Sequence, residues 1–132
     1  MLMFFLPRYL ALTILVLLGV ALLHAVQPVR LGFVADVLAP PLLCLWLVPW
    51  YQAQHQNLQL TDRPRLTYGL AMLDALVQAA LVFISVGSVQ TSGLSDAVLS
   101  FFSVVVFHTL MIYFALGYAI SKAAATPRSK PA

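Results

Sequence analysis

The chain has 132 residues, of which 62% are hydrophobic and 8% are charged. Soluble domains carry about 25% charged residues, so this composition excludes an ordinary soluble globular domain. The formal net charge is +3, and the seven Lys and Arg residues are spread along the chain. Such a spread indicates membrane topology rather than nucleic-acid binding.

Four long apolar runs fill most of the sequence. Each approaches the ~20 apolar residues that cross ~30 Å of hydrocarbon at ~1.5 Å per residue. We therefore predict an all-α polytopic membrane protein, an antiparallel four-helix transmembrane bundle that forms a single domain over residues 1–121. The predicted helices cover residues 9–27, 31–51, 67–89 and 96–121, and residues 122–132 are expected to form a flexible basic cytoplasmic tail.

The basic residues orient the predicted bundle. If four helices cross, six of the seven basic residues fall on one side: Arg8, Arg63, Arg65, Lys122, Arg128 and Lys130. Only Arg30 falls on the other side. Because short basic loops resist translocation, we expect both termini in the cytoplasm, in a bacterial inner (plasma) membrane. If the first run were instead a cleaved signal peptide, three crossings would remain and the asymmetry would be lost.

Two adjacent prolines, Pro40 and Pro41, lie inside the second run. Each removes a backbone donor and crowds the carbonyl four residues earlier, so this helix is predicted to kink or partly unwind over residues 36–39. The freed carbonyls would need partners from another helix or from water. We interpret the kink as tolerated packing, and a functional broken helix of the transporter type is the alternative.

Polar residues inside the apolar runs are the best pointers to a site, because an ionised side chain at the membrane centre costs at least ~2.5–3.5 kcal/mol. Asp74 and Gln78 lie one turn apart on the third run, beside small residues at four-residue spacing. That face is predicted to pack inside the bundle. The opposite face is predicted to contact lipid and holds Leu73, Leu76, Ala80, Phe83 and Ile84.

His108 lies near the middle of the fourth run, at a depth similar to that of Gln78. Asp74 lies ~6 Å closer to the cytoplasm by the helical rise. We predict an intramembrane polar cluster of these three residues, in which His108 hydrogen-bonds Gln78 or Asp74. A second candidate pair, His24 and Asp36, lies near the external side, where we expect it to cap the hairpin in interfacial water rather than form a site.

The sequence lacks the residues and motifs that other kinds of functional site require. Glu does not occur, Cys44 is the single cysteine, and the sequence holds no nucleophile elbow, phosphate-binding loop or paired metal-ligand motif. We therefore expect no enzyme, no metal site and no bound cofactor. The three histidines are predicted at different depths, which disfavours a bis-histidine haem within one chain.

Three functions remain open on the sequence. The first is an accessory, structural or assembly subunit of a larger membrane complex, because the loops are too short to build a site. The alternative is a small oligomeric proton- or cation-coupled transporter or flippase that uses Asp74 and His108. A quinone- or haem-associated membrane anchor subunit is a further alternative. The expected partners are the lipid bilayer and other membrane subunits or further copies of the chain, without nucleic acid.

Overall fold

The computed structural model describes residues 1–26, 31–54, 58–86 and 94–125, with the backbone alone for 24, 31–36, 85–86 and 94. All of the regular structure in this part of the chain is helical. The elements are α1 (Leu2–Val26), α2 (Leu31–Gln54), the 3₁₀ turn η1 (Leu60–Asp62), α3 (Arg63–Val86) and α4 (Leu94–Ala125).

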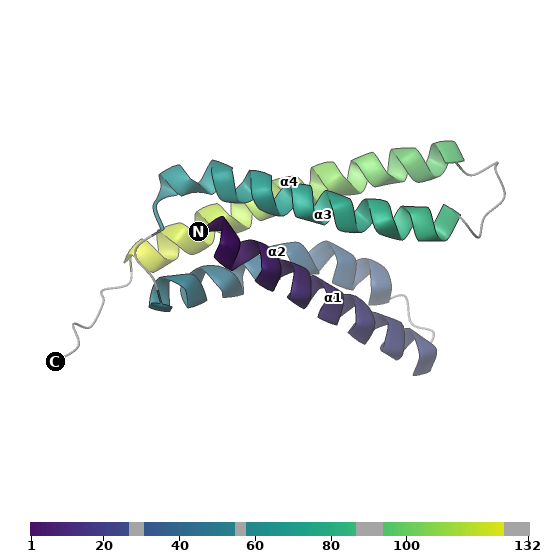
Figure 1. Cartoon of the computed structure of the whole chain (residues 1–132), viewed down its shortest axis with the longest axis horizontal. Coiled ribbons are helices and arrows are strands. Elements are labelled where there is room, and N and C mark those ends of the chain that lie inside the picture. Colours follow the sequence, from purple (N-terminus) through teal and green to yellow (C-terminus); the bar gives the residue numbers. More distant parts are fainter. Residues whose placement is uncertain (27–30, 55–57, 87–93, 126–132) are drawn as a thin grey trace.

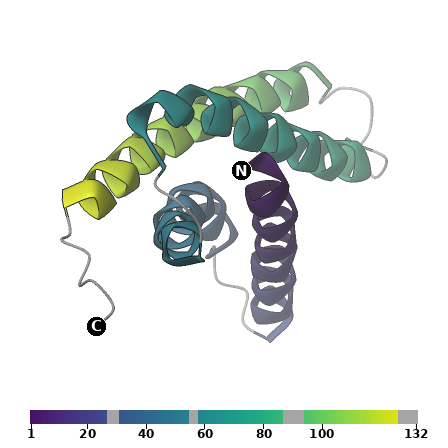
Figure 2. The same cartoon turned by 60° about the vertical axis from the view of Figure 1, so that its left-hand side comes forward.

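Helix α4 packs most extensively, against α2 and α3 alike, and α1 packs less extensively against α2 and α3. In both views, α3 and α4 lie alongside each other, and α1 and α2 lie on the same side of that pair (Figures 1 and 2). The start of α1 and the end of α4 lie at the same end of the molecule (Figure 1).

Three segments of the described chain are long and apolar enough to cross a membrane: Leu2–Leu23, Leu60–Ile84 and Ser95–Ala125. The helix α2 is not among them, although its 24 residues would reach ~36 Å at the α-helical rise. The fold is therefore all-helical with three membrane-compatible helices, and the crossing of α2 stays a prediction.

Helix α1 begins much earlier than the prediction of a start near residue 9. It starts at Leu2 and continues through Pro7. The reason is that the two phenylalanines of this first turn are buried, and the Phe4 ring lies 5.4 Å from Trp50 and 5.0 Å from Tyr51, both in the last turns of α2. Aromatic side chains bury large apolar surfaces, so these contacts stabilise the first turns of α1 as helix.

Other helix ends also differ from the prediction. Helix α3 starts at Arg63 rather than at residue 67, and α4 runs to Ala125 rather than 121, so residues 122–125 are helical and not part of a flexible tail. The rest of the tail lies outside the described residues. Asp62 explains the early start of α3, because its carboxylate accepts the Gln59 backbone N–H at 3.0 Å and thereby fixes the preceding turn.

The prolines of α2 do not unwind it. The helix is continuous from Leu31 to Gln54 with Pro40, Pro41 and Pro49 inside it. The prediction was a kink or a partial unwinding over residues 36–39; the helix is not unwound there, and the kink stays a prediction. A continuous helix still leaves the carbonyls of Asp36 and Val37 without their helical donors, since Pro40 and Pro41 carry no N–H.

The buried core occupies only one half of the bundle, the half that holds the start of α1 and the end of α4. Among side chains that the structure describes, none is buried over residues 10–26 of α1, 75–84 of α3 or 95–107 of α4. The hydrophobic core consists of Phe4, Phe5, Tyr9, Leu43, Cys44, Leu47, Val48, Leu58, Leu66, Leu70, Ile112, Ala115, Leu116, Ala119 and Ile120.

The outer face of α3 is mostly as predicted. Leu76, Phe83 and Ile84 are 64%, 83% and 72% exposed, in keeping with a lipid-facing side, and Ala80 is exposed as well. Leu73 is the exception, because it is partly buried against the core. It lies next to Asp74 in sequence, so the packing that buries the carboxylate also covers part of its neighbour.

Candidate functional site

The centre of the candidate site is a bond between α3 and α4. Asp74 of α3 is 3% exposed, His108 of α4 is 1% exposed, and His108 Nδ1 lies 2.7 Å from Asp74 Oδ2. The prediction was a hydrogen bond from His108 to Gln78 or Asp74, and the structure shows the one to Asp74. At this distance it is a strong hydrogen bond whether the proton resides on the imidazole or on the carboxyl group.

A third helix reaches the same carboxylate. The Tyr9 hydroxyl of α1 donates to Asp74 Oδ1 at 3.3 Å, and the tyrosine is 1% exposed. The distance is long for a hydroxyl donor, so this bond is weaker than the one to His108. Asp74 therefore ties α1, α3 and α4 together, with the tighter bond on the α4 side.

These residues mark the boundary between the packed and the open half of the bundle. Along each helix, Tyr9 is the last buried residue of α1, Asp74 the last of α3, His108 the first of α4, and Pro40 the first of α2 among the described side chains. Tyr9, Asp74 and His108 thus form a polar layer at the end of the hydrophobic core. Beyond it, the described side chains of α1, α3 and α4 are partly buried or exposed.

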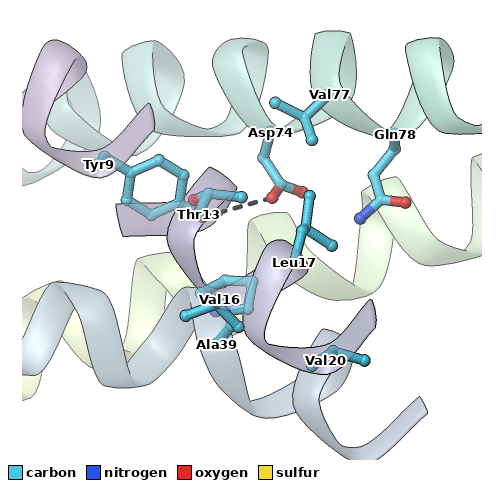
Figure 3. A pocket seen from close by; sticks show the side chains of 10 residues that line it. Tyr9, Thr13, Val16, Leu17, Val20, Ala39, Asp74, Val77 and Gln78 are labelled. Atoms are coloured by element: carbon cyan, nitrogen blue, oxygen red, sulfur yellow. Dashed lines mark hydrogen bonds between the residues drawn. The ribbon is translucent and has the colours of Figure 1, made fainter. Parts of the chain in front are cut away.

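A pocket begins at this layer, between α1, α2 and α3 (Figure 3). The cavity itself is small, about 30 Å³, which is room for one or two water molecules. In the figure Asp74, Tyr9 and Thr13 point toward one another, and Gln78 follows on the same wall. The lining residues are Tyr9, Thr13, Val16, Leu17, Val20, Ala39, Pro40, Asp74, Val77 and Gln78.

The polar atoms of the lining are mostly acceptors of hydrogen bonds or hydroxyls, and the lining contains no Lys, Arg or His. Asp74 is its single ionisable acid. The rest of the wall is aliphatic. Such a surface, apolar with a few convergent polar groups, is the usual form of a small-molecule site.

Thr13 contributes an unpaired hydroxyl. Its Oγ1 atom is buried and has no hydrogen-bond partner in the described part of the chain. Ser103 and Thr109 of α4 behave differently, because each donates to the carbonyl four residues earlier, at 2.9 and 2.7 Å. A buried hydroxyl without a partner costs about 1–3 kcal/mol, so a ligand or a water that bonds to Thr13 would be stabilised there.

Two residues of the site were missed in the sequence. Neither Tyr9 nor Thr13 was predicted to belong to the polar cluster. Helix α1 is apolar all round, so it offers little indication of which face packs inward. The available signal was that Tyr9 and Thr13 carry the hydroxyls of this helix at four-residue spacing, which places them on one face.

The structure places some of the other predicted site residues near Asp74 and does not describe the rest. Gln78 lines the same pocket as Asp74, and Pro40 lines it while Pro41 is buried beside it. The proposed pair of His24 and Asp36 lies outside the described side chains. The described residues contain no group of three or more His, Cys, Asp or Glu side chains that could hold a metal ion.

The fold and the site together define a helical, membrane-compatible protein with a buried carboxylate and imidazole pair beside a pocket. No protein-family model, curated protein or solved structure matches this chain.

Proposed function

We propose that this protein is a small oligomeric proton- or cation-coupled transporter, with the Asp74 and His108 pair as its exchange site. Four membrane crossings, an antiparallel arrangement and cytoplasmic termini are part of the proposal, supported by the one-sided distribution of basic residues. The observation that carries it is the position of Asp74, which hydrogen-bonds His108 on one side and lines a pocket on the other.

The physical argument is one of charge. A carboxyl group paired with an imidazole can share one proton and remain neutral overall, which avoids the cost of an isolated ion in hydrocarbon. When a cation enters the pocket beside Asp74, the carboxylate can pair with that cation instead, and the proton becomes dispensable. A site of this kind exchanges one positive charge for another, which is the requirement for coupled transport.

The incomplete packing supports an oligomer. One half of the bundle has a core and the other half buries no described side chain along α1, α3 and α4. Four helices of this length enclose little volume, so a pathway that reaches Asp74 from both sides of the membrane needs walls from a second copy. The open halves of two chains are the surfaces that would provide those walls.

The proposal is tested in lipid vesicles that contain the purified protein and a trapped pH-sensitive dye. A panel of cations, from Na⁺ and K⁺ to organic ammonium ions, is added outside an acid-loaded interior. At least one cation is expected to drive proton efflux, and Asp74→Asn should abolish that efflux. The matched control is Asp96→Asn, which removes an exposed acid at the start of α4. If no cation drives a flux that depends on Asp74, the proposal is wrong.

The second candidate is the accessory or assembly subunit. The uncovered half of the bundle favours it, because helices of a larger partner could pack there. Gentle detergent extraction followed by native mass spectrometry separates the two candidates. A stable assembly with other proteins supports the subunit, whereas a homodimer or small homo-oligomer supports the transporter.

A further inference from the structure

We propose that the small cavity beside Asp74 binds a water molecule between the Thr13 hydroxyl and the Asp74 carboxylate, and that protons reach Asp74 and His108 through this water. The inference rests on the proposed function, for which it names the path of the proton. Three observations carry it: the size of the cavity, the unpaired hydroxyl of Thr13, and the position of the cavity on the open side of the polar layer.

The cavity has the size of a water site. Its volume is about 30 Å³, and a buried water molecule needs at least about 10–15 Å³. A metal ion that keeps its first shell of water, or an organic cation, is several times larger than the cavity. Water is therefore the ligand that fits this space.

The cavity wall supplies the hydrogen-bond partners that a water molecule needs. The Thr13 Oγ1 atom is buried, and no group in the described part of the chain bonds to it. A carboxylate offers about four lone-pair positions, and the bonds to Tyr9 and His108 use at most two of those of Asp74. Thr13 and Asp74 point toward each other and line the same cavity (Figure 3). A water between them would satisfy the hydroxyl and bond to the carboxylate, as buried waters commonly do for unpaired polar groups.

The cavity extends away from the hydrophobic core. Its wall covers residues 9–20 along α1 and residues 74–78 along α3, in both helices from the polar layer into the open half. On the other side of the layer, core side chains such as Phe5 and Leu116 are fully buried. Water therefore reaches Asp74 from the open half, opposite the end of the molecule that holds the start of α1 and the end of α4 (Figure 1).

The transfer balances in protons and in charge. When Asp74 and His108 have lost their shared proton, the carboxylate is ionised, the imidazole is neutral, and the pair carries one negative charge. A hydronium ion at the water site then donates a proton to an Asp74 oxygen. One O–H bond of the hydronium breaks, one O–H bond of the carboxyl group forms, and a water molecule remains. The pair is neutral again, and the reverse transfer releases the proton.

The titratable groups around Asp74 come from all of the neighbouring helices. Tyr9 of α1 and His108 of α4 hydrogen-bond the carboxylate, and the buried thiol of Cys44 in α2 interacts with it electrostatically. Of these, the imidazole is the group whose ordinary titration falls nearest to neutrality. Asp74 therefore receives the proton from the water, and His108 shares it.

The first experiment detects the water. The protein with isotope-labelled threonine is studied in lipid bilayers by solid-state NMR, with polarisation transferred from water protons to threonine carbons. The Thr13 signal, assigned by its loss in Thr13→Val, should grow several-fold faster than that of Thr109, whose hydroxyl already donates to the Val105 carbonyl. Equally slow growth of the two signals would overturn the inference.

The second experiment asks whether this water carries protons, in the vesicle assay of the proposed function. Thr13→Val keeps the shape of the side chain but removes its hydroxyl, and should slow the Asp74-dependent proton flux about ten-fold through the loss of one hydrogen bond. Thr13→Ser retains a hydroxyl and should recover most of the flux. The matched control, Thr109→Val, should leave the flux unchanged. An unchanged flux in Thr13→Val would overturn the proton path.

A third variant tests the direction of access. Val20→Phe should narrow the cavity at its far end on α1, and should slow both the polarisation transfer from water to Thr13 and the proton flux. Its matched control is Val26→Phe, which adds the same ring at an exposed position of α1 outside the lining. If the two variants behave alike, water does not enter from the open half.

The failure of this inference differs from the failure of the proposed function. If water polarises Thr13 rapidly but no cation drives an Asp74-dependent flux, the water site stands and the transporter is wrong. If the flux depends on Asp74 but Thr13→Val does not change it, the transporter stands and the path through this water is wrong.

Discussion

The His108 imidazole and the Asp74 carboxylate lie 2.7 Å apart at the level where the packed half of the bundle ends. Both side chains are almost fully buried, and Asp74 also lines the pocket. The pair therefore has two consequences that can be measured separately, one for the stability of the bundle and one for the chemistry of the pocket.

Loss of one partner should harm the protein more than loss of both. His108→Leu leaves the Asp74 carboxylate without its strongest partner and should destabilise the fold by roughly 3–5 kcal/mol. The double variant, with Leu at both positions, should recover much of that loss, because no buried charge remains. The measurement is unfolding in mixed micelles with increasing sodium dodecyl sulfate, followed by helical circular dichroism. Equal stability of the single and double variants would contradict the burial of an ionisable pair.

The Tyr9 hydroxyl should matter less than the imidazole. Its bond to Asp74 is 3.3 Å long, so Tyr9→Phe is expected to cost about 0.5–1 kcal/mol in the same unfolding assay. The ring itself is retained, and with it the packing of α1 against the core. A loss as large as that of His108→Leu would show that α1 carries the main bond to the carboxylate.

Two glycines provide a matched pair for the packing between helices. A Cβ atom at Gly117 of α4 would lie 2.6 Å from the guanidinium carbon of Arg63, which donates to the Tyr113 carbonyl and stacks on that ring. A Cβ atom at Gly19 of α1 meets nothing within 4 Å. Gly117→Ala should therefore displace Arg63 and lose up to about 1 kcal/mol of cation and ring contact, which offsets the gain in helix propensity and leaves this variant less stable than Gly19→Ala.

Gly19→Ala should instead be neutral or stabilise the helix by about 0.5–1 kcal/mol, because alanine loses less backbone entropy on folding. Both variants are compared in the micelle unfolding assay. If Gly117→Ala matches Gly19→Ala, Arg63 does not occupy the space beside α4. If Gly19→Ala is the more damaging variant, the open half of α1 is covered by another helix.

Much of the site could be predicted from the sequence, because α3 and α4 each have one face with polar and small residues and an opposite face that is apolar. Asp74 and His108 each interrupt an apolar run, and the small residues around them show which face packs inward. Helix depth placed His108 level with Gln78 and left Gln78 or Asp74 open as its partner, and the structure shows Asp74. Helix α1 gave no comparable signal, so neither the role of Tyr9 nor the pocket between α1 and α3 could be found before the fold was known.

The helix ends show the same limit. The first helix was predicted to begin at residue 9, yet Phe4 and Phe5 are buried and α1 begins at Leu2. The decisive contacts are with Trp50 and Tyr51, which lie more than forty residues away along the sequence. Contacts between residues so far apart in sequence can override local helix propensity, and a local sequence pattern does not predict them.

The membrane topology can be measured with single cysteines in a background that carries Cys44→Ala. Ser95→Cys, at the start of α4, should react with a membrane-impermeant maleimide added outside intact cells. Thr61→Cys, in η1 before α3, should react only after the membrane is permeabilised. Both positions are exposed, so burial does not decide the result. The reverse pattern would place the termini outside and contradict the orientation by basic residues.

The most direct test of the central claim is the reaction of Asp74 with dicyclohexylcarbodiimide, an apolar reagent that adds to protonated carboxyl groups within the bilayer. The modified residue is identified by peptide mass spectrometry in native membranes. We expect labelling at Asp74, because its carboxyl group can share a proton with His108 and lines the pocket. Labelling confined to Asp62 and Asp96, with Asp74 unmodified at every pH, would contradict the account.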